Sequence, residues 1–229
     1  MVKNHLKRIA TPRTWHVARK QSKFITRPNP GAHPFEQSMA LSTFLREVLK
    51  VAKTAREVRF ILHNSQVLVD GKRRRDEKFN IGLMDTISFP ESKQQFRVTL
   101  DAKGRLSAVE IDEKEANKKI SQVKSIKTVK GKKTQLGLAD GRCIFIDKND
   151  YARGDVVLIE LPSQKILKHF KCEKKKPILL VGGKHAGKKA VIDHLEDDMI
   201  VFETENKEKF ETKKEYAFIT GDKEPEVTL

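Results

Sequence analysis

The motif in this 229-residue chain that most resembles a chemical site is Gly182-Gly183-Lys184-His185-Ala186-Gly187-Lys188-Lys189. Glycines and lysine in the spacing G-x-x-x-x-G-K can hold the phosphates of a bound nucleotide. A nucleotide hydrolase needs Ser or Thr at the next position to hold magnesium, but this chain has Lys189. A long helix should also follow the loop, and none is indicated. The sequence therefore predicts a glycine-containing β turn whose basic side chains face a phosphate backbone.

Metal binding and nucleophilic catalysis have weaker support. Cys143 and Cys172 are the only cysteines, and His169 near Cys172 supplies half of a zinc ligand set at most. The usual four-ligand spacing is missing, and so is a Gly-x-Ser-x-Gly elbow. We therefore expect no catalytic residue, no metal, no cofactor and no small-molecule substrate, and we predict that the chain is not an enzyme.

The first 35 residues contain eight basic residues and no Asp or Glu, and the chain's net charge is +16. The positive charges of such a segment repel one another, so the segment needs a polyanion to become ordered. Four prolines exclude one continuous helix, which argues against a mitochondrial presequence. We expect an extended arm that threads into folded RNA, with a solvated disordered tail as the alternative. The basic residues of this arm are Lys3, Lys7, Arg8, Arg13, Arg19, Lys20, Lys23 and Arg27. The planar side chains among them could stack on unpaired bases, and they are His5, Trp15, His16, Phe24 and His33.

A second basic group, Lys72-Arg73-Arg74-Arg75, follows the tight-turn pair Asp70-Gly71. A run of charge is usually only a solvated surface, but this run follows two predicted helices and a β turn. That context favours a cationic ridge for RNA. Arg46 and Arg56, one on each predicted helix, are expected to face the same groove.

Composition favours several small domains, because 38% of residues are hydrophobic and 34% are charged. Apolar runs are too short for a membrane helix, and no secretory signal is evident. Two cysteines fit a reducing, cytoplasmic setting. With a pI near 9.8, nucleic acid is the leading partner and an anionic membrane surface the second.

Hydrophobic spacing predicts the elements that position these groups. Helices are expected over 41–49, from the capping box Thr54-Ala55-Arg56-Glu57 to His63-Asn64, and more weakly over 113–123. Strands are expected over 66–69, 87–89, 96–100, 106–111, 156–161 and 165–170, with a hairpin over 137–146 about Asp140-Gly141. After a linker at 174–177, five strands over 178–181, 190–192, 199–202, 209–212 and 216–219 suggest a small closed barrel.

Several segments together resemble the S4e family of small-subunit ribosomal proteins. The matching motifs lie at residues 5–15, 27–34, 45–49, 54–57, 67–72, 82–85 and 182–187. The resemblance implies a structural protein of archaeal or eukaryotic ribosomes, and the compact length looks archaeal. It implies a helix–helix–β RNA-binding module of the αL type, a central β domain and a C-terminal SH3-like KOW barrel. Asn64-Ser65-Gln66 and Lys188-Lys189 depart from the family pattern.

These observations predict an α+β, multidomain chain. The expected parts are an extended basic N-terminal arm (1–38), an αL-type RNA-binding domain (39–91), a central β-rich domain (92–173), a KOW barrel (174–221) and a frayed acidic tail (222–229). The predicted RNA-binding residues are Lys3, Lys7, Arg8, Arg13, Trp15, Arg19, Lys20, Lys23, Arg27, Arg46, Arg56, Lys72, Arg73, Arg74, Arg75, Lys184, His185, Lys188 and Lys189.

The expected partners are small-subunit rRNA and neighbouring ribosomal proteins in the cytoplasmic ribosome. We expect no membrane partner and no homo-oligomer. Two other functions stay open: an RNA-modifying or tRNA-related enzyme, and a free translation or transcription factor that uses the same RNA-binding module.

Overall fold

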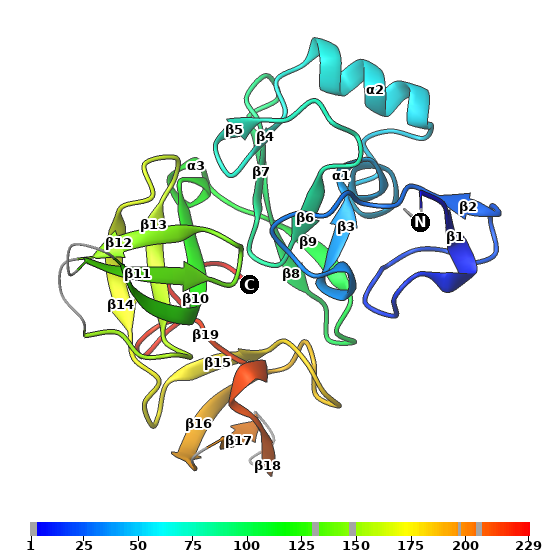
Figure 1. Cartoon of the computed structure of the whole chain (residues 1–229). Helices are drawn as coiled ribbons and strands as arrows, with labels where there is room; N and C mark the ends of the chain where they lie inside the picture. The colour runs from blue at the N-terminus through cyan, green and yellow to red at the C-terminus, as the bar shows by residue number, and fades with distance from the viewer. Residues whose placement is uncertain (1–3, 130–132, 147–149, 197, 205–207) are drawn as a thin grey trace. The chain divides into compact units, whose positions relative to one another are not determined.

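The computed structural model describes residues 4–129, 133–146, 150–196, 198–204 and 208–229. The chain forms two compact units: residues 1–99 with 105–117, and residues 100–104 with 118–229 (Figure 1). It is mostly β, with several sheets and few short helices. The expectation of an α+β chain is corrected in this respect, because only α2 exceeds five residues among the described helices.

The first unit contains three sheets, with strand orders β1-β2, β3-β6 and β5-β4-β7-β8-β9. Its strands are β1 (Leu6–Lys7), β2 (Phe24–Ile25), β3 (Ser38–Ala40), β4 (Leu68–Val69), β5 (Lys72–Arg73), β6 (Asn80–Gly82), β7 (Thr86–Phe89), β8 (Gln94–Leu100) and β9 (Leu106–Glu110). Its helical segments are the 3-10 turns Arg8–Ala10 and Phe35–Gln37, α1 (Leu41–Thr43), the π-helical turn Phe44–Val48, α2 (Ala55–Asn64) and α3 (Glu113–Ala116).

The predicted capping box begins α2. The Glu57 amide donates to Thr54 Oγ1 at 3.2 Å, and the Thr54 amide donates to Glu57 Oε2 at 3.3 Å. These two bonds satisfy amides that the first helical turn leaves without partners. Val58 and Leu62 face the core, whereas Phe60 is 68% exposed. The predicted helix and its start are confirmed.

The Asp70-Gly71 turn is also confirmed. It joins β4 to β5, with Val69 opposite Lys72, and both turn residues have positive φ (50° and 73°). Glycine tolerates that conformation, and aspartate adopts it more readily than most residues. Asp70 Oδ1 also accepts a hydrogen bond from the Thr86 amide at 3.0 Å, which ties the turn to β7.

The N-terminal segment is packed into the first unit, which corrects the expectation of an extended arm. Leu6, Trp15 and Ile25 are buried, and Arg8 is only 1% exposed. The Arg8 guanidinium donates to Ser22 Oγ, the Ala18 carbonyl and Glu47 Oε1 at 3.1, 3.0 and 2.8 Å. Hydrophobic residues and internal acceptors therefore hold parts of this segment against the rest of the first unit.

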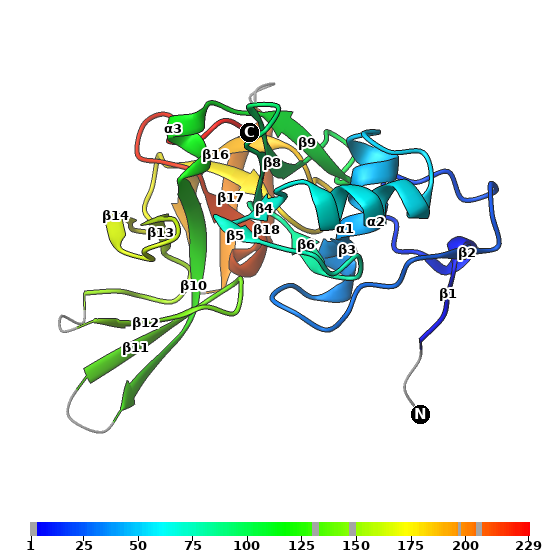
Figure 2. The same ribbon diagram turned by 90° about the horizontal axis from the view of Figure 1, so that it is seen from above.

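The second unit contains two five-stranded antiparallel sheets, in the orders β12-β11-β10-β13-β14 and β18-β17-β16-β15-β19. Figure 2 shows β10, β11 and β12 as a long ribbon. The first sheet comprises β10 (Lys118–Val129), β11 (Lys133–Leu138), β12 (Cys143–Ile146), β13 (Val156–Glu160) and β14 (Ile166–Phe170). The second comprises β15 (Pro177–Leu180), β16 (Lys189–Leu195), β17 (Met199–Thr204), β18 (Lys209–Lys213) and, after a 3-10 turn at Lys214–Tyr216, β19 (Ala217–Ile219).

The five strands predicted in the last section are confirmed, with ends that differ by at most three residues. The strand order places β18 and β19 at the two edges of their sheet. Closure of this sheet into a barrel therefore stays a prediction.

The weak helix prediction over 113–123 is wrong beyond its first turn. α3 ends at Ala116, and the chain continues as the twelve-residue strand β10. The prediction rested on Ala116 and Ile120, which lie four residues apart, as on one face of a helix, and both are buried. In the structure, the pairing register of β10 with β11 shifts between Val123 and Ser125, as at a β-bulge, and this changes the phase of the alternation.

Candidate nucleic-acid interface

Four arm cations remain on the surface of the first unit. Lys7, Arg13, Lys20 and Lys23 are exposed, and no described carboxylate forms an ion pair with any of them. Lys7 lies on β1, directly opposite Phe24 of β2. Lys3 lies outside the described residues.

Two other arm cations are half-buried and partly engaged. Arg19 donates to the carbonyls of Ile9 and Pro12 at 3.2 and 3.0 Å. The Arg27 guanidinium lies 5.5 Å from the centroid of the Phe35 ring, a cation–π geometry. Each can still present part of its charge, but each also stabilises the local fold.

Arg8 and Trp15 do not belong to the exposed surface, although both were predicted to bind RNA. Arg8 bonds to Glu47, as described above, and Trp15 is 2% exposed with its ring 5.6 Å from that of Phe35. His33 is also internal, with Nε2 2.9 Å from Asp85 Oδ1. His5 and Phe24 do remain exposed. Composition alone could not separate these cations and rings, because burial of Arg8 depends on an acceptor 39 residues away.

The ridge at 72–75 has two kinds of side chain. Lys72 and Arg75 are exposed, and neither forms an ion pair with a described carboxylate. Arg73 is exposed and donates to the His63 carbonyl at 3.1 Å. Arg74 packs with its guanidinium 4.4 Å from the centroid of the Phe79 ring. Lys72, Arg73 and Arg75 can therefore reach a phosphate, while Arg74 supports the ridge.

The two helix arginines differ. Arg56 is exposed on α2, whereas Arg46 is half-buried in the π-helical turn, 3.5 Å from Glu47 Oε1. Whether they face one groove stays a prediction.

The glycine loop of the second unit is a hairpin connection. β15 pairs antiparallel with β16, with Leu179 opposite Lys189, so a strand follows the loop where a nucleotide hydrolase would have a helix. Gly187 is required for packing: its φ is 86°, and an added Cβ would lie 1.8 Å from the Asp101 carbonyl oxygen. The prediction of a glycine-containing β turn is confirmed, and the contact of its basic side chains with a phosphate backbone stays a prediction.

The basic side chains of this loop are presented differently. Lys184 and Lys188 are exposed, and Lys189 donates to the main-chain oxygen of Leu229 at 3.1 Å. The His185 ring packs 4.3 Å from that of Phe210. Partial burial, with Lys188 and Lys184 nearby, lowers the pKa of His185 below 6.5, so the imidazole resists becoming a cation.

The His169 and Cys172 pair has a structural explanation. Asp155 accepts from His169 Nε2 at 2.7 Å, the Cys172 amide at 3.0 Å and the Ala152 amide at 2.9 Å. Burial raises the pKa of the Cys172 thiol, which favours the neutral form over the thiolate that metals bind. No cluster of three potential metal ligands occurs in the described part of the chain.

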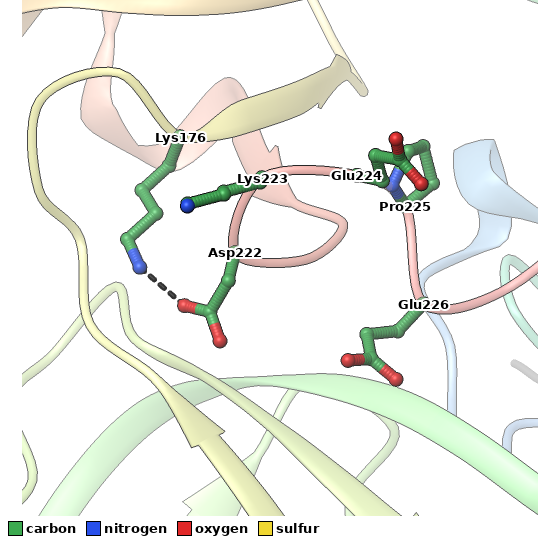
Figure 3. A pocket seen from close by; sticks show the side chains of 6 residues that line it. All are labelled: Lys176, Asp222, Lys223, Glu224, Pro225 and Glu226. Atoms are coloured by element: carbon green, nitrogen blue, oxygen red, sulfur yellow. Dashed lines mark hydrogen bonds and ion pairs between the residues drawn. The ribbon is translucent and has the colours of Figure 1, made fainter.

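The acidic tail is folded, which corrects the expectation of fraying. Val227 is 3% exposed, and the Glu226 amide donates to the Thr220 carbonyl at 3.0 Å. Lys176 binds Asp222 across a shallow pocket (Figure 3), and Lys168 Nζ lies 2.5 Å from Glu226 Oε1. The tail therefore neutralises two lysines of its own unit.

The buried cations have carboxylate partners, whereas many of the exposed cations have none among the described residues. Arg8, Arg97 and Lys119, each at most 1% exposed, lie 2.8, 2.7 and 3.3 Å from Glu47, Glu115 and Asp140 respectively. A buried charge needs such a partner. Lys7, Arg13, Lys20, Lys72, Arg75, Lys184 and Lys188 have none among the described carboxylates. They are among the exposed positive charges that remain for an external anion. Across the same described residues, no helix is long and apolar enough to cross a membrane.

Comparisons with known proteins give a consistent result along the chain. Residues 92–166 match the family described as "Ribosomal family S4e", and residues 2–36 match the RS4NT (NUC023) domain. The small ribosomal subunit protein eS4 of Methanocaldococcus jannaschii is 40% identical over 240 residues, which cover 99% of this chain and 98% of that protein. The protein of the same name from Methanosphaera stadtmanae is 39% identical over 233 residues, with coverage of 99% and 96%.

A solved structure is also similar. The crystal structure of the 30S ribosomal protein S4e from Thermoplasma acidophilum superposes with a TM-score of 0.71 at 29% sequence identity. The match covers 81% of this chain and 96% of that one.

Proposed function

The chain belongs to the ribosomal S4e family, and on this premise we propose that it is a structural constituent of the small ribosomal subunit, not an enzyme, which holds small-subunit rRNA through exposed cations of both units. The proposed contacts with rRNA are supported by the difference between the buried and the exposed cations described above. Buried cations have carboxylate partners, whereas the exposed ones at 7, 13, 20, 72, 75, 184 and 188 have none among the described residues.

These cations suit phosphate better than base recognition. Lysine and arginine on exposed turns and short strands neutralise a backbone without reading sequence, and phosphate contacts dominate affinity for nucleic acids. Lys72 and Arg75 supply this charge in the first unit, and Lys184 and Lys188 supply it in the second. Specificity would come from the shape of the folded rRNA.

The finer architecture is also part of the proposal. Residues 39–91 form an αL-type RNA-binding module, residues 92–173 a central β domain, and residues 174–221 a KOW barrel. Helix α2 and the Asp70-Gly71 hairpin that follows it support the assignment of the RNA-binding module. The five antiparallel strands β15–β19 support the assignment of the KOW barrel. Neighbouring ribosomal proteins of the cytoplasmic ribosome would cover surfaces that RNA does not.

The salt dependence of binding tests the proposed contacts. If about eight phosphates are neutralised, the slope of log K against log salt should be near −7, and less steep for single-stranded RNA. The purified chain would be titrated with a small-subunit rRNA transcript over a range of KCl concentrations. Salt-insensitive binding would contradict the proposal. A free factor would in addition wash off small subunits in high salt, whereas a structural constituent would sediment with them.

A further inference from the structure

The short ribbon of β1 and β2 has an inner and an outer face. Leu6 pairs with Ile25, and Lys7 pairs with Phe24. Successive side chains of a strand point to opposite faces, so the buried pair Leu6 and Ile25 places Lys7 and Phe24 on the outside. Phe24 is 52% exposed. Packing within the chain therefore leaves about half of the surface of Phe24 uncovered.

The surroundings of the Phe24 ring are aromatic and cationic. The His5 ring lies 5.9 Å away, tilted by 50°, and Lys23 Nζ lies 5.5 Å from the Phe24 centroid. Both rings line a groove of about 360 Å³. This size falls within the range of about 300–1,000 Å³ that is usual for ligand sites.

The charge of the groove indicates its occupant. Arg27, Arg46 and Lys78 line it together with Glu77. The Glu77 carboxylate is already engaged, since Arg59 Nε and Nη2 donate to it at 2.9 and 3.0 Å. The groove thus offers an exposed ring beside an excess of positive charge. Single-stranded nucleic acids are bound by this combination: bases stack on aromatic rings while cations follow the phosphates.

We propose that this groove binds one unpaired nucleotide of RNA, with its base stacked on Phe24 and its phosphate held by the surrounding cations. The inference deepens the RNA-binding role proposed above and rests on it. It replaces the buried Trp15 with Phe24, assisted by His5, as the base-stacking residue of the N-terminal segment.

The test uses the full chain and a single-stranded oligouridine RNA that carries one central 2-aminopurine, whose fluorescence is quenched when it stacks. Phe24→Ala removes the platform, and Phe24→Tyr keeps an aromatic ring. Phe60→Ala is the matched control, because Phe60 is an exposed phenylalanine of the same unit (68%, against 52% for Phe24) that does not line the groove. Circular dichroism checks that each variant is folded.

We expect Phe24→Ala to weaken binding about 5- to 150-fold, the usual effect of removing one stacked aromatic side chain. It should also abolish the quenching, while Phe24→Tyr and Phe60→Ala match the wild type. Wild-type affinity and quenching in Phe24→Ala would overturn the inference alone. If the wild-type chain fails to bind RNA, the proposed function falls, and the nucleotide site falls with it. In an intact subunit, a neighbouring protein's side chain against Phe24 would likewise overturn the site.

Discussion

His33 Nε2 lies 2.9 Å from Asp85 Oδ1, in a pair whose side chains are only 7% and 4% exposed. Asp85 Oδ2 also accepts from the Gly82 amide at 2.9 Å. The imidazole occupies space that a side chain at position 82 would fill, because a Cβ on Gly82 would lie 2.2 Å from His33 Cγ. Gly82 and Asp85 therefore form the site on which the N-terminal segment docks.

Gly82→Ala should destabilise the first unit. The added methyl group must displace the His33 ring or the backbone, and such overpacking costs about 1–3 kcal/mol. Urea denaturation of the full chain measures the loss in the free energy of unfolding.

A double-mutant cycle with His33→Ala provides the control for this prediction. Without the imidazole, the methyl group has room, so Gly82→Ala should cost much less in the His33→Ala background. Equal costs in both backgrounds would show that the His33 ring does not occupy this position.

Lys72→Ala with Arg75→Ala should weaken rRNA binding through lost phosphate contacts. Each lost contact reduces the magnitude of the salt slope by about one, so the double variant should lose about two. Affinity measured from 50 to 300 mM KCl gives the slope, and the thermal midpoint should stay unchanged because both side chains are exposed. Lys209→Ala is the control, since Asp193 already holds that ammonium group and neither residue belongs to the proposed interface. An unaltered slope in the double variant would remove the ridge from the interface.

The pKa of His185 should be measurable below 6.5 by NMR titration of its ring protons, because burial, Lys188 and Lys184 all disfavour the imidazolium. Burial is the largest cause, so Phe210→Ala should raise this pKa more than Lys188→Ala does. Lys223→Ala, which alters an exposed lysine of the tail, should leave it unchanged. A pKa at or above 6.5 in the wild type would contradict the described packing.

The lowered pKa of His185 also predicts how the stability of the second unit depends on pH. The unfolded chain binds a proton more readily at this position than the folded chain does. The second unit should therefore lose stability as pH falls through 6.5 toward the lower folded-state pKa, and retain it at higher pH. His185→Gln should reduce this acid-dependent loss, which urea midpoints at pH 7.5 and pH 5 would reveal.

The folded tail should stabilise the second unit. Val227→Ala removes two buried methyl groups, and we expect a loss of about 1–2 kcal/mol in the free energy of unfolding. Glu224→Ala, at an exposed position of the same segment, is the matched control. If both variants unfold like the wild type, the tail is not docked in solution.

Local sequence signals predicted the elements that depend on few residues. The Thr54–Glu57 capping box and the Asp70-Gly71 turn each rest on hydrogen bonds or φ angles within four residues, and both are confirmed. The strands of the last section were found because short apolar runs alternate with turn residues. The sequence also indicated the family, since motifs along most of the chain matched it in order.

Long-range contacts explain what the sequence did not reveal. Burial of Arg8 requires Glu47, and the buried ammonium group of Lys119 on β10 requires Asp140. The weak helix prediction over 113–123 rested on Ala116 and Ile120 alone, and these two residues gave no sign of the distant ion pair between Lys119 and Asp140. Similarly, nothing near Trp15 in sequence indicated that it would be buried while Phe24 would stay exposed.

A map of the intact small subunit at side-chain resolution would show whether exposed cations hold this chain on rRNA. We expect phosphate oxygens within about 4 Å of the side-chain nitrogens of Lys72, Arg75, Lys184 and Lys188, the usual limit for an ion pair. If these four side chains face solvent, or bind only protein carboxylates, exposed cations do not hold this chain on rRNA.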